Sequence, residues 1–301
     1  MLQDKIRQLK EERNAIILAH NYQIGEIQDI ADYVGDSLGL SQKATESNAD
    51  VIVFCGVDFM AESAAILNPD KTVLMPDVGA TCPMAMMITP EALRAEKKKH
   101  PDAAVVCYVN TSAAVKAESD ICCTSSNAVK IVNSMNEKEI IFVPDKNLSL
   151  YVAAKTNKKI IPWDGYCPSH HIILKGDVLL AKAKHPAGKI LVHPECRPEV
   201  IELADEVLST GGMVRYVKGS SAMGFIIGTE IGILYRLRKE NPDKTFYPSS
   251  NQAVCPNMKK NTLDKVAKAL KNMEHQITVP EDIRIKAKQA LDKMLKVGRD
   301  D

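Results

Sequence analysis

The chain has 301 residues, of which 45% are hydrophobic and 26% are charged, and its formal net charge at pH 7 is +1. This composition is ordinary for a globular protein, and the balanced charge provides no basic field for nucleic acid. No apolar run approaches the ~20 residues that cross a membrane, and the polar segment 1–13 does not resemble a signal peptide. We therefore expect a cytoplasmic protein that binds neither nucleic acid nor a membrane.

In chain order, the same series of elements occurs three times. Each copy begins with a helix, predicted over 2–12, 90–99 and 177–184. A first apolar strand with a polar end follows, within 15–22, 104–111 and 189–196. Next come a helix and an acidic turn, ending within 31–37, 118–127 and 204–212. A second strand lies within 51–59, 140–147 and 225–232, and a third within 71–77, 158–163 and 244–249. Self-similarity of this kind indicates an internal repeat.

The repeat predicts the fold class. Strands that alternate with helices are typical of parallel βαβ units, and continuous apolar strands indicate a sheet that helices cover on both faces. We expect an α/β protein with three analogous αβα domains, 1–82, 83–167 and 168–255, around a pseudo-threefold axis, with helices in 261–301 packed back on the first domain. Ligands bind beyond the carboxyl ends of parallel strands, so the site should lie where three such edges meet.

Three of the eight cysteines occupy equivalent positions in the three copies. Cys82, Cys167 and Cys255 are 85 and 88 residues apart, lie in loops after strands and are each followed by proline. Three convergent thiolates without a fourth cysteine indicate a metal centre with one open coordination position. These ligands suit zinc with a bound water, or three irons of a 4Fe-4S cluster. Spacing alone does not decide between the two.

The other five cysteines have simpler interpretations. Four lie in or beside apolar elements, where cysteine behaves as a small buried hydrophobe: Cys55, Cys107, Cys122 and Cys123. Cys196 has no counterpart in the other copies. Eight cysteines without an export signal indicate a reducing compartment rather than a disulfide framework.

A series of motifs from residue 17 to residue 263 resembles the quinolinate synthase family. The motifs are ILAHNYQ (17–23), QDIADYVGDS (28–37), GVDFMAE (56–62), LNPDK (67–71), ATCPMA (80–85), YVN (108–110), CTSSNAV (123–129), HPEC (193–196), STGGM (209–213), GTEIG (228–232) and VCPNMKKNTL (254–263). The resemblance implies a transferase that condenses iminoaspartate with dihydroxyacetone phosphate to quinolinate, the precursor of NAD. It also implies a 4Fe-4S cluster held by Cys82, Cys167 and Cys255, and L-aspartate oxidase or aspartate dehydrogenase as the supplier of iminoaspartate. It assigns no role to Tyr166, Ser169 or Cys196.

The polar residues of the repeat fit two anionic substrates. Ser37, Ser125 and Thr210 are equivalent and lie where a loop enters a helix, where hydroxyls and backbone N–H groups bind anions. Tyr108 and Asn110 supply neutral donors at a strand end, which suits a carboxylate or a developing oxyanion.

Proton transfer needs titratable groups near the substrate, and four are candidates. His20 and His193 end equivalent first strands, Tyr22 follows His20, and Glu195 lies two residues after His193. We expect His20, His193 and Glu195 also to contact substrate, with Glu195 as the general acid or base.

Two other classes of function use the same cysteines. A zinc-dependent hydrolase would hold its metal with the three thiolates and would be colourless. A cluster-based redox or iron sensor would not turn over substrate, and the sequence contains no recognisable DNA-reading element. A visible spectrum separates the first from a cluster enzyme, and a quinolinate assay separates the second.

Overall fold

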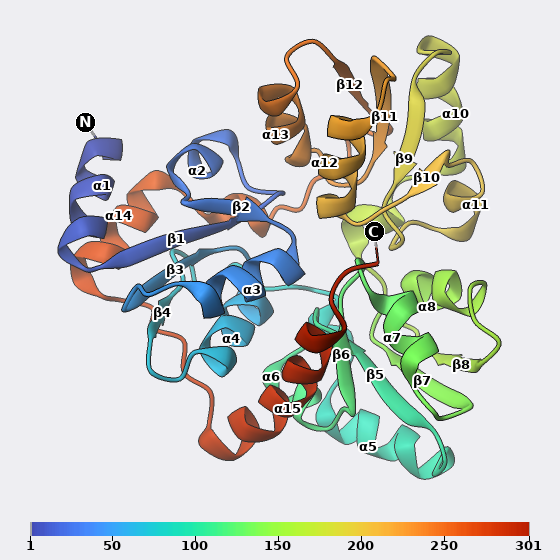
Figure 1. Ribbon diagram of the computed structural model, residues 1–301, viewed down its shortest axis with the longest axis horizontal. Helices are drawn as coiled ribbons and strands as arrows, with labels where there is room; N and C mark the ends of the chain where they lie inside the picture. Colours follow the sequence, from blue (N-terminus) through green and yellow to red (C-terminus); the bar gives the residue numbers. More distant parts are fainter. Residues whose placement is uncertain (1, 301) are drawn as a thin grey trace.

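The computed structural model describes residues 2–300 and has three α/β lobes around a common centre (Figure 1). Each lobe contains one four-stranded sheet whose strands are all parallel, with the orders β2-β1-β3-β4, β6-β5-β7-β8 and β10-β9-β11-β12. The predicted class, a threefold repeat of parallel-sheet αβα units, is therefore confirmed. The domain limits at residues 82, 167 and 255 stay a prediction.

The first lobe begins the chain. Its elements are α1 (Leu2–Glu12), β1 (Ala15–His20), α2 (Gly25–Ile30), β2 (Tyr33–Gly35), α3 (Ser37–Glu46), β3 (Val51–Cys55), α4 (Asp58–Leu67) and β4 (Thr72–Leu74). All five residues of β3 are buried, as expected for a strand that helices cover on both faces.

The second lobe repeats this order after a short 3-10 turn, η1 (Ala85–Met87). Its elements are α5 (Pro90–Lys99), β5 (Ala104–Tyr108), α6 (Ala113–Ala117), β6 (Ile121–Cys123), α7 (Ala128–Ser134), β7 (Glu139–Val143), α8 (Lys146–Ala153) and β8 (Lys159–Pro162). Thr89 caps the N-terminus of α5 by accepting the N–H of Ala92, and Pro90 occupies the first turn, which explains why this helix begins where the sequence predicts.

The third lobe follows the second cysteine loop. Its elements are α9 (Pro168–His171), α10 (Lys175–Lys184), β9 (Lys189–Val192), α11 (Pro198–Ile201), β10 (Glu206–Val207), α12 (Thr210–Gly219), β11 (Gly224–Gly228), α13 (Ile233–Glu240), β12 (Thr245–Pro248) and the 3-10 turn η2 (Met258–Lys260). None of the helices within residues 2–300 is both long and apolar enough to cross a membrane.

One strand in each sheet is missing from the sequence prediction. The segments expected to be a helix and an acidic turn contain the edge strands β2, β6 and β10, which are only two or three residues long. Strands this short carry too few residues for a period-2 pattern. Their tertiary pairing defines them, as when Leu18 of β1 pairs with Tyr33.

Two further helices follow the repeats. α14 (Leu263–Asn272) packs against α1, and α15 (Glu281–Val297) packs mainly on α6 and β6, with additional contacts to α4. The sequence analysis places both helices with the first lobe. α14 lies there, whereas α15 lies between the first and second lobes and contacts both (Figure 1). Its buried residues Ala287, Leu291 and Met294 join the main hydrophobic core. That core includes Leu18, Val106 and Phe225, one from each sheet, so the lobes share a continuous apolar interior.

Candidate active site

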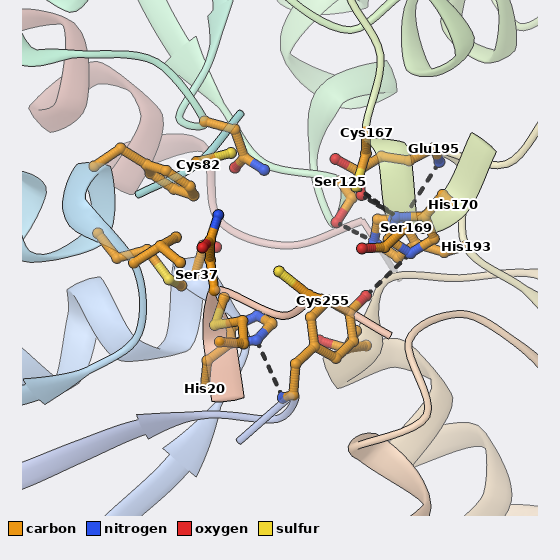
Figure 2. A pocket seen from close by; sticks show the side chains of 18 of the residues that line it. His20, Ser37, Cys82, Ser125, Cys167, Ser169, His170, His193, Glu195 and Cys255 are labelled. Atoms are coloured by element: carbon orange, nitrogen blue, oxygen red, sulfur yellow. Dashed lines mark hydrogen bonds and ion pairs between the residues drawn. The ribbon is translucent and has the colours of Figure 1, made fainter. Parts of the chain in front are cut away.

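One pocket lies where the three lobes meet, and every residue that the sequence predicts for the site lines it (Figure 2). These residues are His20, Tyr22, Ser37, Cys82, Tyr108, Asn110, Ser125, Cys167, His193, Glu195, Thr210 and Cys255. They follow the carboxyl ends of strands in three different sheets. The structure therefore brings them together through the packing of the lobes.

The three cysteine loops share a second repeated feature, a carboxylate that accepts the cysteine N–H. The donor–acceptor distances are 3.0 Å from Cys82 to Asp58, 3.3 Å from Cys167 to Asp145 and 3.1 Å from Cys255 to Glu230. Each carboxylate lies just beyond the third strand of its lobe (β3, β7 or β11). The same device therefore orients all three thiols.

Burial makes the three thiols weak acids. It raises the pKa of Cys82 to about 12, raises that of Cys167 well above its ordinary value, and raises that of Cys255. Backbone N–H groups of Ala85 and Met258 hydrogen bond to the sulfurs of Cys82 and Cys255 and partly offset this effect. A bound cation stabilises thiolates in such surroundings, so the loops suit metal binding better than nucleophilic catalysis.

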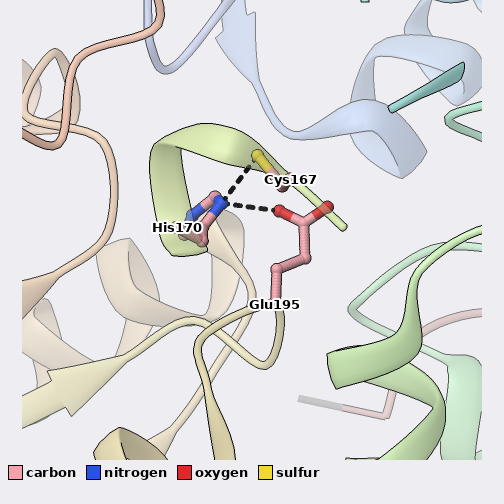
Figure 3. Close-up of side chains that lie close together, drawn as sticks. All are labelled: Cys167, His170 and Glu195. Atoms are coloured by element: carbon pink, nitrogen blue, oxygen red, sulfur yellow. Dashed lines mark hydrogen bonds and ion pairs between the residues drawn. The ribbon is translucent and has the colours of Figure 1, made fainter. Parts of the chain in front are cut away.

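The spacing of the thiols differs from that of a single-zinc site. Two thiolates on one tetrahedral zinc ion, with Zn–S near 2.3 Å, lie about 3.8 Å apart. Among residues 2–300, the group whose ligand atoms all lie within 4.8 Å of one another is Cys167, His170 and Glu195, and not the three cysteines (Figure 3). The three sulfurs are thus not all within 4.8 Å of one another, a wider arrangement than that of three thiolates on one zinc ion.

The two predicted histidines occupy the same kind of turn. The Nδ1 atom of His20 accepts the N–H of Tyr22 at 3.2 Å, and the Nδ1 atom of His193 lies 3.3 Å from the N atom of Glu195. Burial lowers the pKa of His20 to about 3, so this imidazole is neutral at physiological pH. With Nδ1 as an acceptor, a neutral His20 carries its proton on Nε2.

Glu195 is a buried carboxylate between two imidazoles. Its Oε2 atom lies 2.9 Å from Nδ1 of His170 and 3.3 Å from Nδ1 of His193. Burial opposes ionisation, but the two imidazoles hold the pKa of Glu195 well below its ordinary value. Its Oε1 atom has no hydrogen-bond partner among the described residues, which leaves one oxygen available to a ligand.

The hydroxyl residues are placed as the repeat predicts. Ser37 and Thr210 are the first residues of α3 and α12, and Ser125 lies in the turn before α7. The hydroxyl of Thr210 accepts a hydrogen bond from Asn21, and that of Ser125 lies 3.1 Å from Nε2 of His193. The first turns of α3 and α12 thus direct N–H groups toward the pocket.

Comparison with known proteins assigns this arrangement to a family. The family model described as "Quinolinate synthetase A protein" matches residues 4–296. The quinolinate synthase of Methanosarcina barkeri is 61% identical over 294 residues, which cover 98% of this chain and 97% of that protein. Those of Dehalococcoides mccartyi strain CBDB1 and Thermodesulfovibrio yellowstonii are 59% and 58% identical, over 99% and 97% of this chain and 98% and 97% of those proteins. The chain belongs to the quinolinate synthase family. The resemblance drawn from its motifs is confirmed.

In this quinolinate synthase family member, the sequence analysis missed two residues that complete the site. Nε2 of His170 lies 2.7 Å from the hydroxyl of Thr229 and 3.2 Å from that of Tyr22, and the two hydroxyls are 2.5 Å apart. Nδ1 of His170 lies 3.2 Å from the sulfur of Cys167. His170 thus joins Tyr22 and Thr229 to the Glu195 carboxylate. The available signals were its position three residues after Cys167 and the position of Thr229 just beyond β11.

The residues left without a role are now placed. Ser169 lines the pocket, and its hydroxyl donates to the carbonyl of Val254 at 3.2 Å. Tyr166 does not line the pocket: it is exposed and lies against the ring of His171. Cys196 is buried outside the pocket, with its sulfur 3.3 Å from the carbonyl oxygen of Gly228. Four other cysteines are buried as small hydrophobes: Cys55, Cys107, Cys122 and Cys123.

Proposed function

We propose that this chain condenses iminoaspartate with dihydroxyacetone phosphate to quinolinate, with release of phosphate and two water molecules. The observation that carries the proposal is the single pocket in which a cysteine from each repeat faces a set of anion-binding groups. Membership of the quinolinate synthase family supports it. As a producer of the NAD precursor, the enzyme would act in the cytoplasm, next to an enzyme such as L-aspartate oxidase or aspartate dehydrogenase that supplies iminoaspartate.

Cys82, Cys167 and Cys255 would hold a 4Fe-4S cluster, with one iron lacking a cysteine ligand. When bound, the cluster supplies a Lewis acid that can polarise an oxygen leaving as water. Their equivalent positions in the three repeats, their place in one pocket and their burial support this ligand set. The three carboxylates that accept the cysteine N–H groups hold the loops ready for it.

The hydroxyl residues would bind the anionic groups of the two substrates. Ser37 and Thr210 combine a hydroxyl with a helix N-terminus, which favours phosphate or carboxylate, and Ser125 adds a third hydroxyl. The neutral His20 offers its Nε2 proton without needing to ionise. Tyr108 is also neutral, because burial raises its pKa well above the ordinary value. Together with Asn110 it can donate to a carboxylate or an oxyanion.

Glu195 and the groups around His170 would transfer the protons. The Oε1 atom of Glu195, which has no partner among the described residues, can accept a substrate proton. A proton can also pass between Oε2 of Glu195 and Nδ1 of His170. On its other side, His170 reaches the Tyr22 and Thr229 hydroxyls. This chain of contacts provides a path for protons within the site.

A second metal arrangement follows from the same pocket. Cys167, His170 and Glu195 have the sulfur, nitrogen and oxygen atoms of a three-ligand zinc site, with a fourth position open to water. A zinc hydrolase on these residues is therefore the alternative function. It predicts zinc rather than iron in the purified protein and no quinolinate formation.

Anaerobic purification followed by iron, sulfide and zinc analysis, together with a quinolinate assay, tests the proposal. We expect about four irons and four sulfides per chain, and quinolinate from the two substrates. Cys167→Ala should lose most of the iron. Cys196→Ala, at a cysteine of the same lobe outside the pocket, should keep it. Stoichiometric zinc without iron, or wild-type iron content in Cys167→Ala, would overturn the assignment.

A further inference from the structure

The chain that follows α15 runs into the centre of the molecule and ends beside α3, α7 and α12 (Figure 1). There Arg299 forms a two-point ion pair with Asp36, at 2.6 Å from Nη1 to Oδ2 and 2.7 Å from Nη2 to Oδ1. A bidentate arginine–carboxylate pair has a defined geometry as well as charge. Asp36 is 5% exposed and lines the active-site pocket.

The same short segment also contacts the second lobe and is linked to the third lobe through Asp36. The N–H of Asp300 donates to the carbonyl of Ser126 at 2.8 Å, and the side chain of Lys130 donates to the carbonyl of Arg299 at 3.1 Å. In the third lobe, the hydroxyl of Ser209 lies 3.4 Å from Oδ2 of Asp36. Asp36, Ser126 and Ser209 directly precede or follow Ser37, Ser125 and Thr210. The segment therefore bonds beside the first two hydroxyl residues and is linked to the third through Asp36.

The packing at this point leaves little room for movement. A Cβ atom on Gly211, in the first turn of α12, would lie 2.2 Å from Oδ2 of Asp36 and 3.1 Å from Nη1 of Arg299. Asp36 caps α3 by accepting the N–H of Gly39 at 2.8 Å, and Ser209 caps α12 by accepting that of Gly212 at 3.0 Å. The two helix starts that present Ser37 and Thr210 are therefore joined through one carboxylate.

Without a counter-charge, the carboxylate of Asp36 would weaken anion binding. A buried negative charge beside the pocket repels a phosphate or carboxylate, and it is weakly screened there. Burial opposes ionisation of Asp36, but the hydrogen bonds and charge of Arg299 lower its pKa, with a smaller contribution from Arg215. Asp36 is thus ionised, and Arg299 is its directly bonded counter-charge.

We propose that Arg299 is a positioning residue for the anion-binding part of the site: it neutralises Asp36 and fixes the starts of α3 and α12 so that Ser37 and Thr210 can bind an anion. This inference rests on the proposed function for the identity of the anion, the phosphate of dihydroxyacetone phosphate. It does not depend on the metal, because Arg299 acts on the hydroxyl residues and not on the cysteines.

The test compares four variants of the iron-loaded enzyme: Arg299→Ala, Arg299→Lys, Asp36→Asn and the double variant Arg299→Ala/Asp36→Asn. The readouts are the Kd of inorganic phosphate by calorimetry and the KM of dihydroxyacetone phosphate. Arg299→Ala should weaken both by roughly tenfold to a hundredfold, the loss of a charge-assisted interaction, with kcat and iron content changed much less. Arg299→Lys should fall between Arg299→Ala and wild type.

The double variant separates charge from simple loss of packing. Asparagine also caps helices, so removing the Asp36 charge should restore most of the phosphate affinity lost in Arg299→Ala, and Asp36→Asn alone is the reference for this double variant. Arg284→Ala, which breaks an arginine–carboxylate pair at the other end of α15, is the matched control and should bind phosphate normally. Unchanged phosphate affinity in Arg299→Ala, or no recovery in the double variant, would overturn the inference. If the wild type makes no quinolinate, the proposed function fails, while phosphate binding still decides the role of Arg299.

Discussion

At the residue scale, His20 and His193 show how equivalent positions acquire different chemistry. His20 is the last residue of β1 and His193 directly follows β9, and the backbone N atom two residues later lies near Nδ1 in each. Burial is the largest influence on the pKa of His20 and lowers it to about 3. His193 instead lies beside the Glu195 carboxylate and stacks on His170 at 4.6 Å. One is a neutral donor, and the other belongs to a charged cluster.

The buried neutral state of His20 predicts a pH-dependent stability. Its pKa is about 3 in the folded chain and 6.5 in the unfolded chain, so between these values the unfolded state binds the extra proton. The free energy of unfolding should therefore fall as pH drops below 6.5. By pH 5 the contribution of His20 is about 2 kcal/mol. Denaturant unfolding of the metal-free protein at pH 7.5 and pH 5 should show a smaller loss in His20→Gln than in wild type.

Asn251→Gln, a change without a titratable group at an exposed position of the third lobe, serves as the control for this measurement. It should lose as much stability on acidification as the wild type does. Equal losses in His20→Gln and wild type would show that His20 is not held neutral.

Glu195 predicts a catalytic defect without a binding defect. Glutamine keeps the size and the hydrogen bonds of one oxygen, but it cannot exchange a proton with substrate. We expect Glu195→Gln to retain iron and to lose about 10²–10⁴ in kcat, the usual effect of removing a general acid or base. Steady-state kinetics and iron analysis measure both effects. Glu202→Gln, at an exposed position of the same lobe, should behave as wild type, and near-normal kcat in Glu195→Gln would move the role to His170 or Tyr22.

At the scale of elements, the repeated unit is a strand end followed by a helix start. Ser37 and Thr210 each begin a helix whose preceding residue, Asp36 or Ser209, provides the cap. The capping residue satisfies part of the helix terminus, and the next residue keeps its hydroxyl for the pocket. A single copy of the repeat does not reveal these separate roles, because a serine before a helix is usually just a cap.

This arrangement predicts that Ser37→Ala raises KM while the helix stays folded. Loss of a hydrogen bond to a charged group costs about 1.5–3 kcal/mol, which corresponds to roughly tenfold to a hundredfold in KM for dihydroxyacetone phosphate. Ser41→Ala, one turn further along α3, removes a hydroxyl that bonds only the backbone carbonyl of Ser37 and should leave KM unchanged. If both variants have the same KM as wild type, Ser37 does not bind substrate.

At the scale of the whole molecule, the proposed metal site would join the three lobes. Cys82, Cys167 and Cys255 come from loops after β4, β8 and β12. A group bound to all three would therefore link distant parts of the chain. Binding to the folded state alone raises stability by mass action. The lobes already share a hydrophobic core, so the metal-free chain should still fold.

We therefore expect anaerobic removal of the cluster with a chelator to lower the Tm by at least about 5 °C, as a few kcal/mol would for a chain of this size. Differential scanning calorimetry before and after chelation measures this shift. Cys167→Ala, which should lack the cluster, provides the control because chelator should not change its Tm. Identical Tm values for loaded and metal-free wild type would mean that the cluster does not link the lobes.

The sequence by itself determined the strand ends, the cysteine loops and the serine and histidine positions, because each is a local pattern that recurs three times. It could not determine contacts across the lobes. Tyr22 and Thr229 are 207 residues apart, and Asp36 and Arg299 are 263 residues apart. No local pattern relates such residues, since their contacts depend on how three independently built sheets pack around the centre. Only the tertiary structure decided that His170 would join Glu195 to Tyr22 and that Arg299 would face Asp36.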